Sequence, residues 1–183
     1  MRKKSMDELN RLSAEQYKHA EKHPVVLVLE NVRSMLNVGS IFRTSDAFRI
    51  EAICLCGYTP TPPHREINKT ALGATETVSW HYYANAVAAI EVLCAAGFRI
   101  FALEQTANST SLQDLNWNGN ENIAFVLGNE AEGVLSETIA LCDDAIEIPQ
   151  FGMKHSLNIS VAGGVLLWQL MHQIIPSAKH VKS

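Results

Sequence analysis

Residues 148–160 have the sequence Ile148-Pro149-Gln150-Phe151-Gly152-Met153-Lys154-His155-Ser156-Leu157-Asn158-Ile159-Ser160. An apolar run before this segment predicts a strand over 145–148, and the apolar run that follows it predicts a helix over 159–175. Ser156 and Asn158 are residue types preferred where the first N–H groups of a helix lack partners. A strand end, a loop and a helix N-terminus place free donors and polar side chains around one crevice. An ordinary helix cap would explain the same residues, so this segment alone leaves both interpretations open.

Five more apolar runs precede this segment. The β-branched and aliphatic run at 25–29 is typical of a strand buried on both faces of a parallel sheet. Further strands are expected at 52–56, 78–83, 98–103 and 123–127. Six strands that alternate with helical patterns predict an α/β fold, a mainly parallel sheet flanked by helices.

The helical patterns between the strands are less uniform. A polar helix is expected over 5–22, with Ser5 and Glu8 as a capping box. Asn37 is expected to cap a helix that runs to about residue 48. Other helices are expected at 84–96 and 134–142, and a short helix or turn at 67–74. Gly163 and Gly164, inside the last helix, predict a close backbone approach.

Composition restricts the class of protein. The chain has 183 residues, 47% hydrophobic and 19% charged, as in a soluble globular protein. Its four cysteines, Cys54, Cys56, Cys94 and Cys142, lack metal-ligand spacing, which favours buried thiols in a reducing, cytoplasmic compartment and no metal site. Net charge is −4, but eleven of the fifteen Lys and Arg lie in residues 1–69. Local positive charge matters more than the total for contact with phosphates, although a solvated surface explains the asymmetry equally well.

Polar clusters follow three of the expected strands, where functional residues of open α/β sheets gather. One contains Asn37, Gly39 and Arg43, and Gly39 is expected to leave room beside the guanidinium four residues later. The second contains Gly128, Asn129 and Glu130, and the third is the segment at 148–160. A buried Arg43–Glu130 pair would explain those two residues without a function. The sequence has no GxGxxG after the first strand, no P-loop and no G-x-S-x-G elbow.

Together the clusters resemble the SpoU (TrmH-like) family of tRNA/rRNA 2′-O-ribose methyltransferases, in the SPOUT superfamily. The resemblance rests on residues 37–44 (NVGSIFRT), 125–133 (FVLGNEAEG) and 148–162 (IPQFGMKHSLNISVA), with support from 69–74 (KTALGA). It covers nearly the whole chain, from about residue 25 to 175. It implies a SpoU-type methyltransferase domain over 24–176, preceded by an N-terminal helical extension (1–23) and followed by a short tail (177–183).

The resemblance also implies a C-terminal deep trefoil knot, S-adenosyl-L-methionine as cofactor, and a homodimer. By motif matching, the cofactor contacts would be Leu103, Glu104, Gly128, Ile148 and Leu157. We expect a glycine at 128 because a side chain would crowd the adenosyl group.

The resemblance places the catalytic residues at Arg43, Asn37, Glu130, Ser156 and Asn158. A guanidinium resists deprotonation, so Arg43 suits phosphate binding and oxyanion stabilisation better than the role of general base. Asn37 and Glu130 would orient Arg43 and the ribose. Ser156 and Asn158 would hold the phosphate or the cofactor.

The expected substrate is structured RNA, with tRNA first and rRNA next, and no membrane partner. Larger members of the family carry a separate RNA-binding domain, so here the phosphate contacts would come from surface cations. The candidates are Arg2, Lys3, Lys4, Arg33, Arg65 and Lys69, with Lys179, His180 and Lys182 in the tail. Two other hypotheses stay open: a catalytically silent RNA-binding or assembly factor with the same fold, and a flavodoxin-like nucleotide-binding domain.

Overall fold

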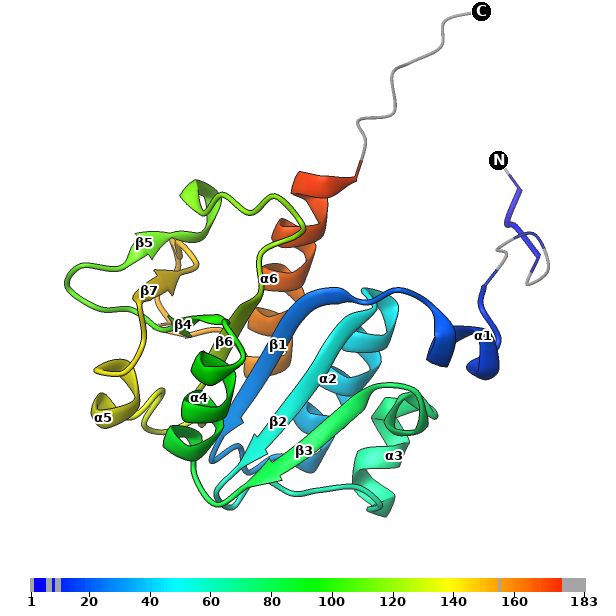
Figure 1. The fold of residues 1–183 in the computed structure, drawn as a ribbon, viewed down its shortest axis with the longest axis horizontal. Coiled ribbons are helices and arrows are strands. Elements are labelled where there is room, and N and C mark those ends of the chain that lie inside the picture. The colour runs from blue at the N-terminus through cyan, green and yellow to red at the C-terminus, as the bar shows by residue number, and fades with distance from the viewer. Residues whose placement is uncertain (1, 6–7, 9–10, 155, 176–183) are drawn as a thin grey trace, which may run out of the picture.

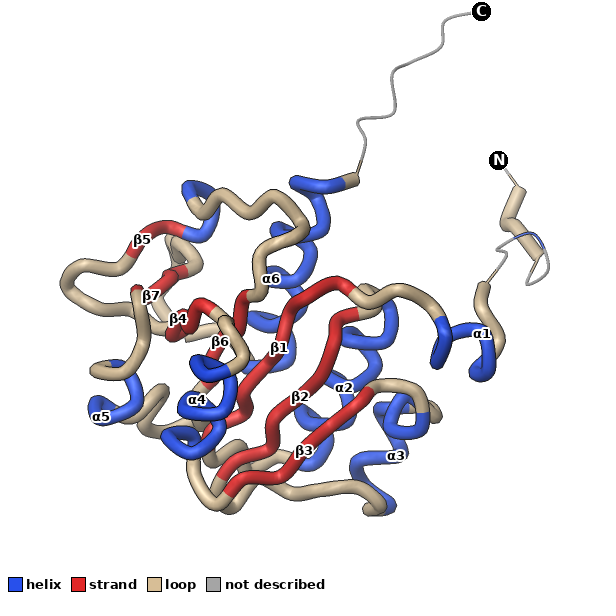
Figure 2. Tube along the Cα trace, in the orientation of Figure 1, coloured by secondary structure: helices blue, strands red, loops and turns tan. Residues whose placement is uncertain are grey.

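The computed structural model describes residues 2–5, 8, 11–154 and 156–175. These residues form a seven-stranded sheet in the order β3-β2-β1-β6-β4-β7-β5, with helices on both faces (Figure 1 and Figure 2). Every neighbouring pair of strands is parallel. The strands are β1 His23–Glu30, β2 Ile50–Cys56, β3 Ser79–Tyr83, β4 Arg99–Leu103, β5 Thr110–Ser111, β6 Ile123–Leu127 and β7 Asp144–Glu147.

All six expected strands are therefore present, and the α/β prediction is confirmed. The short strand β5 was missed, because it lies in a polar segment and pairs only at residues 110 and 111, with β7. The α-helices are α1 Ala14–His19, α2 Met35–Ala47, α3 Arg65–Ala71, α4 Ala86–Ala95, α5 Ser136–Ile139 and α6 Ile159–Ile174. Two 3₁₀ turns follow α3 and β5, at Ala74–Glu76 and Leu112–Asp114. Knotting of the C-terminal segment stays a prediction of the resemblance.

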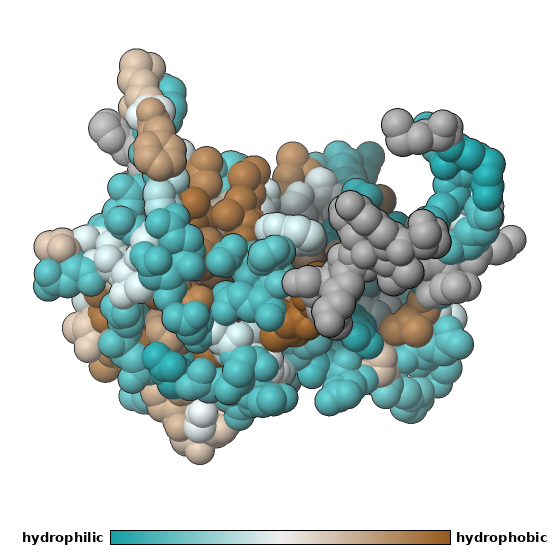
Figure 3. All heavy atoms as spheres, turned by 90° about the horizontal axis from the view of Figure 1, so that it is seen from above, coloured by the Kyte–Doolittle hydropathy of each residue, from teal (hydrophilic) through white to brown (hydrophobic). Residues whose placement is uncertain are grey.

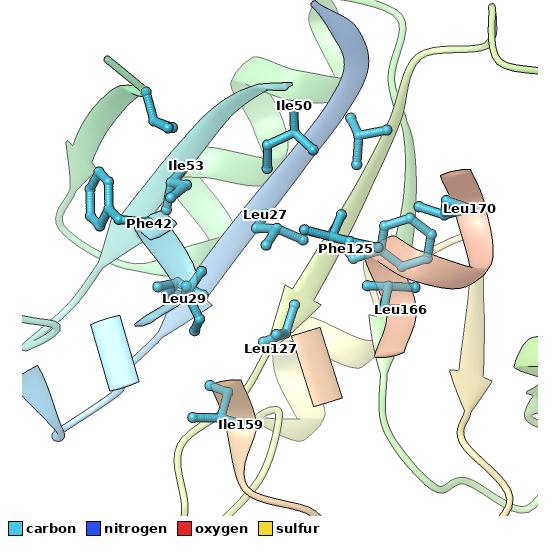
Figure 4. Packing of buried hydrophobic residues seen from close by; sticks show 14 of the residues in the cluster. Leu27, Leu29, Phe42, Ile50, Ile53, Phe125, Leu127, Ile159, Leu166 and Leu170 are labelled. Carbon is cyan, nitrogen blue, oxygen red and sulfur yellow. The ribbon is translucent and has the colours of Figure 1, made fainter. Parts of the chain in front are cut away.

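The sheet separates two hydrophobic cores. Along β1, Val25, Leu27 and Leu29 point to the core beneath α2 and α6, whereas Val26 and Val28 point to the core beneath α4. This two-sided burial is the physical reason for the unbroken apolar run in the sequence. Figure 4 shows Leu27, Phe125 and Leu127 of the sheet beside Leu166 and Leu170 of α6, and Phe42 of α2 in the same layer.

The start of α2 differs from the prediction. Ser34 is the N-cap, and its hydroxyl accepts a hydrogen bond from the Asn37 N–H at 3.3 Å. Asn37 therefore lies in the first turn of α2, and its side chain is free to reach partners outside the helix.

The expected helix over 5–22 is wrong in its extent. Among the described residues of this range, only Ala14–His19 forms an α-helix, and a capping box of Ser13 and Gln16 begins it. Tyr17 is the one side chain of this helix that is buried, so little packing energy supports a longer one. The Ser5–Glu8 capping bonds do form, at 2.7 and 3.3 Å. The helix expected over 134–142 is also shorter, and the tail 177–183 lies outside the described residues.

The glycines of the two packed helices behave differently from expectation. A Cβ at Gly163 would meet only the Leu127 side chain, at 3.4 Å, and one at Gly164 would lie 4.0 Å from Thr44, so no close backbone approach occurs in α6. A Cβ at Gly39 would lie 2.2 Å from the Ile67 carbonyl oxygen. Gly39 is thus needed for the approach of α2 to α3, and the room expected beside Arg43 is not its purpose.

The cysteines partly follow the prediction. Cys54 and Cys56 are buried, and burial raises the pKa of Cys54 to about 12. Cys94 is exposed, because it lies on the outer side of α4. Within the described part of the chain there is no cluster of residues that would hold a metal ion, and no helix is long and apolar enough to cross a membrane.

Candidate functional site

Three side chains from distant parts of the sequence meet at the carboxyl edge of the sheet. The Asn37 amide donates to the Glu130 carboxylate at 2.9 Å, and the Asn158 amide donates to the Asn37 side-chain oxygen at 3.2 Å. Asn37 belongs to α2, Glu130 to the loop after β6, and Asn158 to the start of α6. The structure therefore joins one residue from each of the three predicted polar clusters in a single network.

Asn158 serves as a helix cap and as part of this network. Its side-chain oxygen accepts hydrogen bonds from the Ser160 N–H at 2.9 Å and from the Ser160 hydroxyl at 2.7 Å. Its amide nitrogen is left to donate to Asn37. The two interpretations of this residue are therefore compatible, because they use different atoms.

Glu130 is held in its ionised form. Partial burial alone would raise the pKa of this carboxyl. Its own backbone N–H and the Asn37 amide oppose that effect, as do the backbone N–H groups of Arg33 and Ser34. These hydrogen bonds outweigh burial, so the pKa lies below its ordinary value.

A cavity of roughly 680 Å³ opens beside the network. All five residues predicted to contact a cofactor line it: Leu103, Glu104, Gly128, Ile148 and Leu157. Glu130, Ser156 and Asn158 line it as well. Eight of the ten predicted site residues thus surround one space, whose volume is typical of a small-molecule site.

Gly128 is required for a steric reason that the prediction did not include. A Cβ at this position would lie 1.9 Å from the carbonyl carbon of Gly133, which is backbone and cannot move aside cheaply. The loop after β6 folds back on itself here, with a bridge between Asn129 and Gly133. The glycine therefore shapes the cavity wall, whatever occupies the cavity.

Asn129, which the sequence placed in the second polar cluster, was not among the predicted site residues. It is 4% exposed, and its side-chain oxygen accepts the N–H groups of Ala131 and Glu132 at 2.8 and 2.9 Å. These bonds form an Asx turn that sets the path of the loop next to Glu130. Its position after the strand-end glycine placed it in the predicted cluster, but its part in shaping the loop was not predicted.

Two carboxylates fix the far end of the same loop. Glu104 accepts the Val134 N–H at 3.0 Å, and Glu30, which is 2% exposed, accepts the Leu135 N–H at 2.9 Å and the Thr138 hydroxyl at 2.5 Å. Glu104 was predicted as a cofactor contact, and it also supports the wall. Glu30 was missed, because an acidic residue at a strand end gives no sign of its partner.

The charged side chains that line the cavity are acidic. Its lining includes Glu104, Glu130, Glu132 and Glu147, and no Lys or Arg belongs to the described residues that line it. Leucine and isoleucine side chains supply apolar walls. Such a lining suits a ligand with a positive charge and an extended apolar portion.

Arg43 lies outside this arrangement. It is exposed on α2, and none of the ion pairs between described residues includes it. Glu130 bonds to Asn37 in its place, so the buried Arg43–Glu130 pair does not form. Among the other candidate cations, Arg33 and Arg65 are exposed, while Lys69 pairs with Glu66 at 2.7 Å and Arg2 with Glu8 at 2.7 Å.

Comparison with known proteins gives consistent matches. A profile of the SpoU rRNA Methylase family matches residues 24–168. The 23S rRNA (guanosine-2′-O-)-methyltransferase RlmB of Vibrio vulnificus is 31% identical over 160 residues, which cover 87% of this chain and 63% of that protein. The tRNA (guanosine(18)-2′-O)-methyltransferase of Thermus thermophilus is 31% identical over 152 residues, which cover 81% of this chain and 75% of that protein.

Solved structures show the same fold. The TrmH/SpoU tRNA modifying enzyme of A. aeolicus has a TM-score of 0.76 at 26% identity, covering 87% of this chain and 79% of that one. An AdoMet-bound rRNA methyltransferase from Sinorhizobium meliloti has a TM-score of 0.77 at 25% identity, covering 87% and 60%. The chain spans about three-fifths of the length of the RlmB relatives it matches.

Proposed function

The chain belongs to the SpoU rRNA Methylase family, and on that premise we propose that it is an RNA 2′-O-methyltransferase that uses S-adenosyl-L-methionine. The observation that carries the proposal is the meeting of Asn37, Glu130 and Asn158 at the rim of a cavity lined by all five expected cofactor contacts. A fold alone would not support this reaction, because function depends on the site.

The cavity fits the proposed cofactor. S-adenosyl-L-methionine carries a sulfonium and an ammonium group, which match the glutamate-rich lining, and its adenosyl portion suits the apolar walls. When bound, it supplies the activated methyl group. Leu103, Ile148 and Leu157 would hold the adenosyl portion, and the narrow turn at Gly128 would fix the wall beside it.

The protein residues would orient and polarise the ribose hydroxyl. The lowered pKa of Glu130 makes it a weak base at neutral pH, so it suits holding the hydroxyl better than removing its proton. Asn37 fixes Glu130 and is itself held by Asn158, and Ser156 offers a hydroxyl to the same space. Arg43 has no ion pair among the described residues, so its guanidinium is available to an RNA phosphate and to negative charge that develops on the 2′-oxygen.

For the substrate we propose tRNA first and rRNA next. The relative that acts on tRNA is covered over 75% of its length, against 63% for the first RlmB relative, which acts on 23S rRNA. The similarity therefore extends over a larger share of the relative that acts on tRNA.

We also propose a homodimer formed through α6. The outward side of this helix carries Val161, Val165 and Trp168, which are 51%, 38% and 55% exposed, at helical spacing. In Figure 3 brown hydrophobic side chains reach the surface between teal hydrophilic regions. An apolar stripe of this kind on a soluble protein marks an association surface.

Ribose methylation provides the direct test. RNA from a strain that lacks the protein and from its parent would be mapped for 2′-O-methylation by mass spectrometry, with tRNA and rRNA analysed separately. We expect one ribose methyl group to be lost from tRNA and to be restored by the purified protein with S-adenosyl-L-methionine. Calorimetry that shows no cofactor binding would overturn the proposal in favour of a catalytically silent RNA-binding factor.

Arg43→Ala tests the role of the exposed guanidinium. We expect methyl transfer to fall by at least about 10²-fold, because a transition-state contact is lost, while cofactor affinity stays within about twofold of wild type. Turnover measured with labelled cofactor, alongside calorimetry, separates the two effects. Unchanged turnover would remove Arg43 from the mechanism.

A further inference from the structure

An exposed surface of aromatic and cationic side chains adjoins the Asn37–Glu130–Asn158 network. It consists of Arg33, Tyr58 and Tyr82, which we call the tyrosine platform. Tyr58 is 52% exposed and Tyr82 is 55% exposed, so neither side chain contributes fully to a core. The Arg33 guanidinium lies over the Tyr58 ring, with its central carbon 5.8 Å from the ring centroid. The Tyr82 hydroxyl donates to the Gly57 carbonyl oxygen at 3.1 Å.

The platform is held directly against the proposed site. The Arg33 backbone N–H donates to the Glu130 carboxylate at 3.4 Å, so the residue that carries the guanidinium also bonds to the network. The strands β1 and β2, which precede Arg33 and Tyr58, are parallel neighbours and end at the same edge of the sheet. A nucleotide placed beside the network would therefore meet the platform next.

The two loops that carry the platform are locked together. Thr59, which is 3% exposed, donates its hydroxyl to the Leu29 carbonyl at 2.9 Å and accepts the Val32 N–H at 2.9 Å. The Asn31 side chain accepts the Tyr58 N–H at 3.4 Å. These bonds tie the chain after β1 to the chain after β2. Arg33 and Tyr58 are thus presented on a preorganised base, which lowers the entropy cost of binding a ligand.

The chemistry of the platform fits RNA better than a protein partner. Unstacked bases bind to aromatic rings and guanidinium planes, and a nearby cation neutralises the backbone phosphate. Tyrosine and arginine are also common at interfaces between proteins, but this surface is bonded to the network beside which the proposed function places an RNA ribose. Contact with Tyr58 and the nearby charges of Glu132 and Glu130 raise the pKa of Arg33, which remains a full cation.

We propose that the tyrosine platform binds the nucleotide that flanks the methylated ribose, with an unpaired base stacked on Tyr58 and its phosphate held by Arg33. This inference rests on the proposed function and adds a determinant of substrate recognition outside the cofactor cavity. It predicts that the protein prefers a target ribose in a loop, where the neighbouring base is free to stack.

The test uses Tyr58→Ala, Arg33→Ala and the conservative Tyr58→Phe in the full chain. RNA affinity is measured by fluorescence anisotropy with a labelled hairpin that contains the mapped target, and steady-state kinetics give KM for RNA and kcat separately. We expect Tyr58→Ala to raise the Kd and KM for RNA about tenfold, with cofactor affinity unchanged, and Tyr58→Phe to stay near wild type. Arg33→Ala should weaken binding and reduce its salt dependence.

Arg99→Ala is the matched control. Arg99 also lies over an aromatic ring, that of Phe101 at 4.9 Å, but it begins β4 and so lies at the opposite edge of the sheet. It should leave RNA affinity unchanged. A Kd for RNA of Tyr58→Ala within twofold of wild type overturns the inference. If Tyr58→Ala instead changes the oligomeric mass and leaves the Kd for RNA unchanged, the surface is a protein interface and the inference is also overturned. If wild type shows no RNA methylation, the proposed function itself fails.

Discussion

Hydrogen bonds lower the pKa of Glu130, and this makes its contribution to stability dependent on pH. A carboxyl whose pKa is depressed in the folded state stabilises the fold above its unfolded pKa of about 4.3. That contribution is lost as pH falls through the lower folded-state pKa. We expect Glu130→Gln to lower the melting temperature at neutral pH and the deficit to shrink below about pH 4. Thermal melts from pH 7 downwards, with the exposed Glu137→Gln as control, measure this; a constant deficit would contradict it.

Substitution of Gly128 tests how closely the two sides of the loop after β6 pack against each other in the cavity wall. A methyl group at this position would meet the backbone of Gly133 at 1.9 Å, so Gly128→Ala must displace the loop. We expect a loss of stability of about 1–3 kcal/mol and a weaker cofactor affinity. Gly152→Ala is the control, since nothing lies within 4 Å of its added Cβ. Chemical denaturation and calorimetry would show both effects, and equal behaviour of the two variants would refute the steric argument.

Single residues of the site were predictable where their type was informative. Glycines, amides and carboxylates at strand ends marked Asn37, Gly128, Glu130 and Asn158, and these residues do meet. Their pairing was not predictable, because a hydrogen-bond partner depends on side-chain geometry. Arg43 was expected beside Glu130, but the shorter Asn37 amide, placed in the first turn by the Ser34 cap, takes that position.

At the scale of elements, replacing a glycine of α6 and a glycine of α2 by alanine should change the stability of the protein in opposite directions. Gly164→Ala should stabilise the protein by up to about 1 kcal/mol, because alanine favours the helix and its Cβ would make only an ordinary contact with Thr44 at 4.0 Å. Gly39→Ala should destabilise it, because its Cβ would lie 2.2 Å from the Ile67 carbonyl oxygen. Urea denaturation of both variants tests the pair. Destabilisation by Gly164→Ala would mean that another chain packs closely there.

Helices and strands could be predicted from the sequence where most of their side chains are buried, because burial requires apolar residues at those positions. The run at 25–29 identified β1 because every one of these side chains is buried. The strand β5 and the short α1 were not identified correctly, since few of their side chains are buried and hydrogen bonds to neighbouring segments determine them.

At the scale of the whole molecule, the exposed stripe on α6 predicts the state of assembly. Trp168→Glu would place a charge at the most exposed residue of that stripe, so we expect it to convert a dimer to a monomer. Val92→Glu is the matched control, because Val92 is 52% exposed on α4, on the other face of the sheet. Light scattering after gel filtration measures the mass. Unchanged mass for Trp168→Glu would exclude this surface as the dimer contact.

The architecture of the whole molecule was only partly encoded in local patterns. Buried strands alternating with helices predicted a parallel sheet, but the spatial order of the strands depends on long-range pairing that no short window records. The order and spacing of three motifs identified the family, which periodicity could not, but the strand order was not predicted.

The wide separation of the network residues along the chain affects when the site exists during protein synthesis. Glu130 lies 93 residues after Asn37, and Asn158 lies 121 residues after it. A chain emerging from the ribosome therefore exposes Asn37 long before its partners, and contacts of such separation close late in folding. Until α6 has emerged, the nascent chain holds neither the last member of the network nor the helix that carries the apolar stripe. Completion of the site and readiness for assembly thus depend on the same final helix.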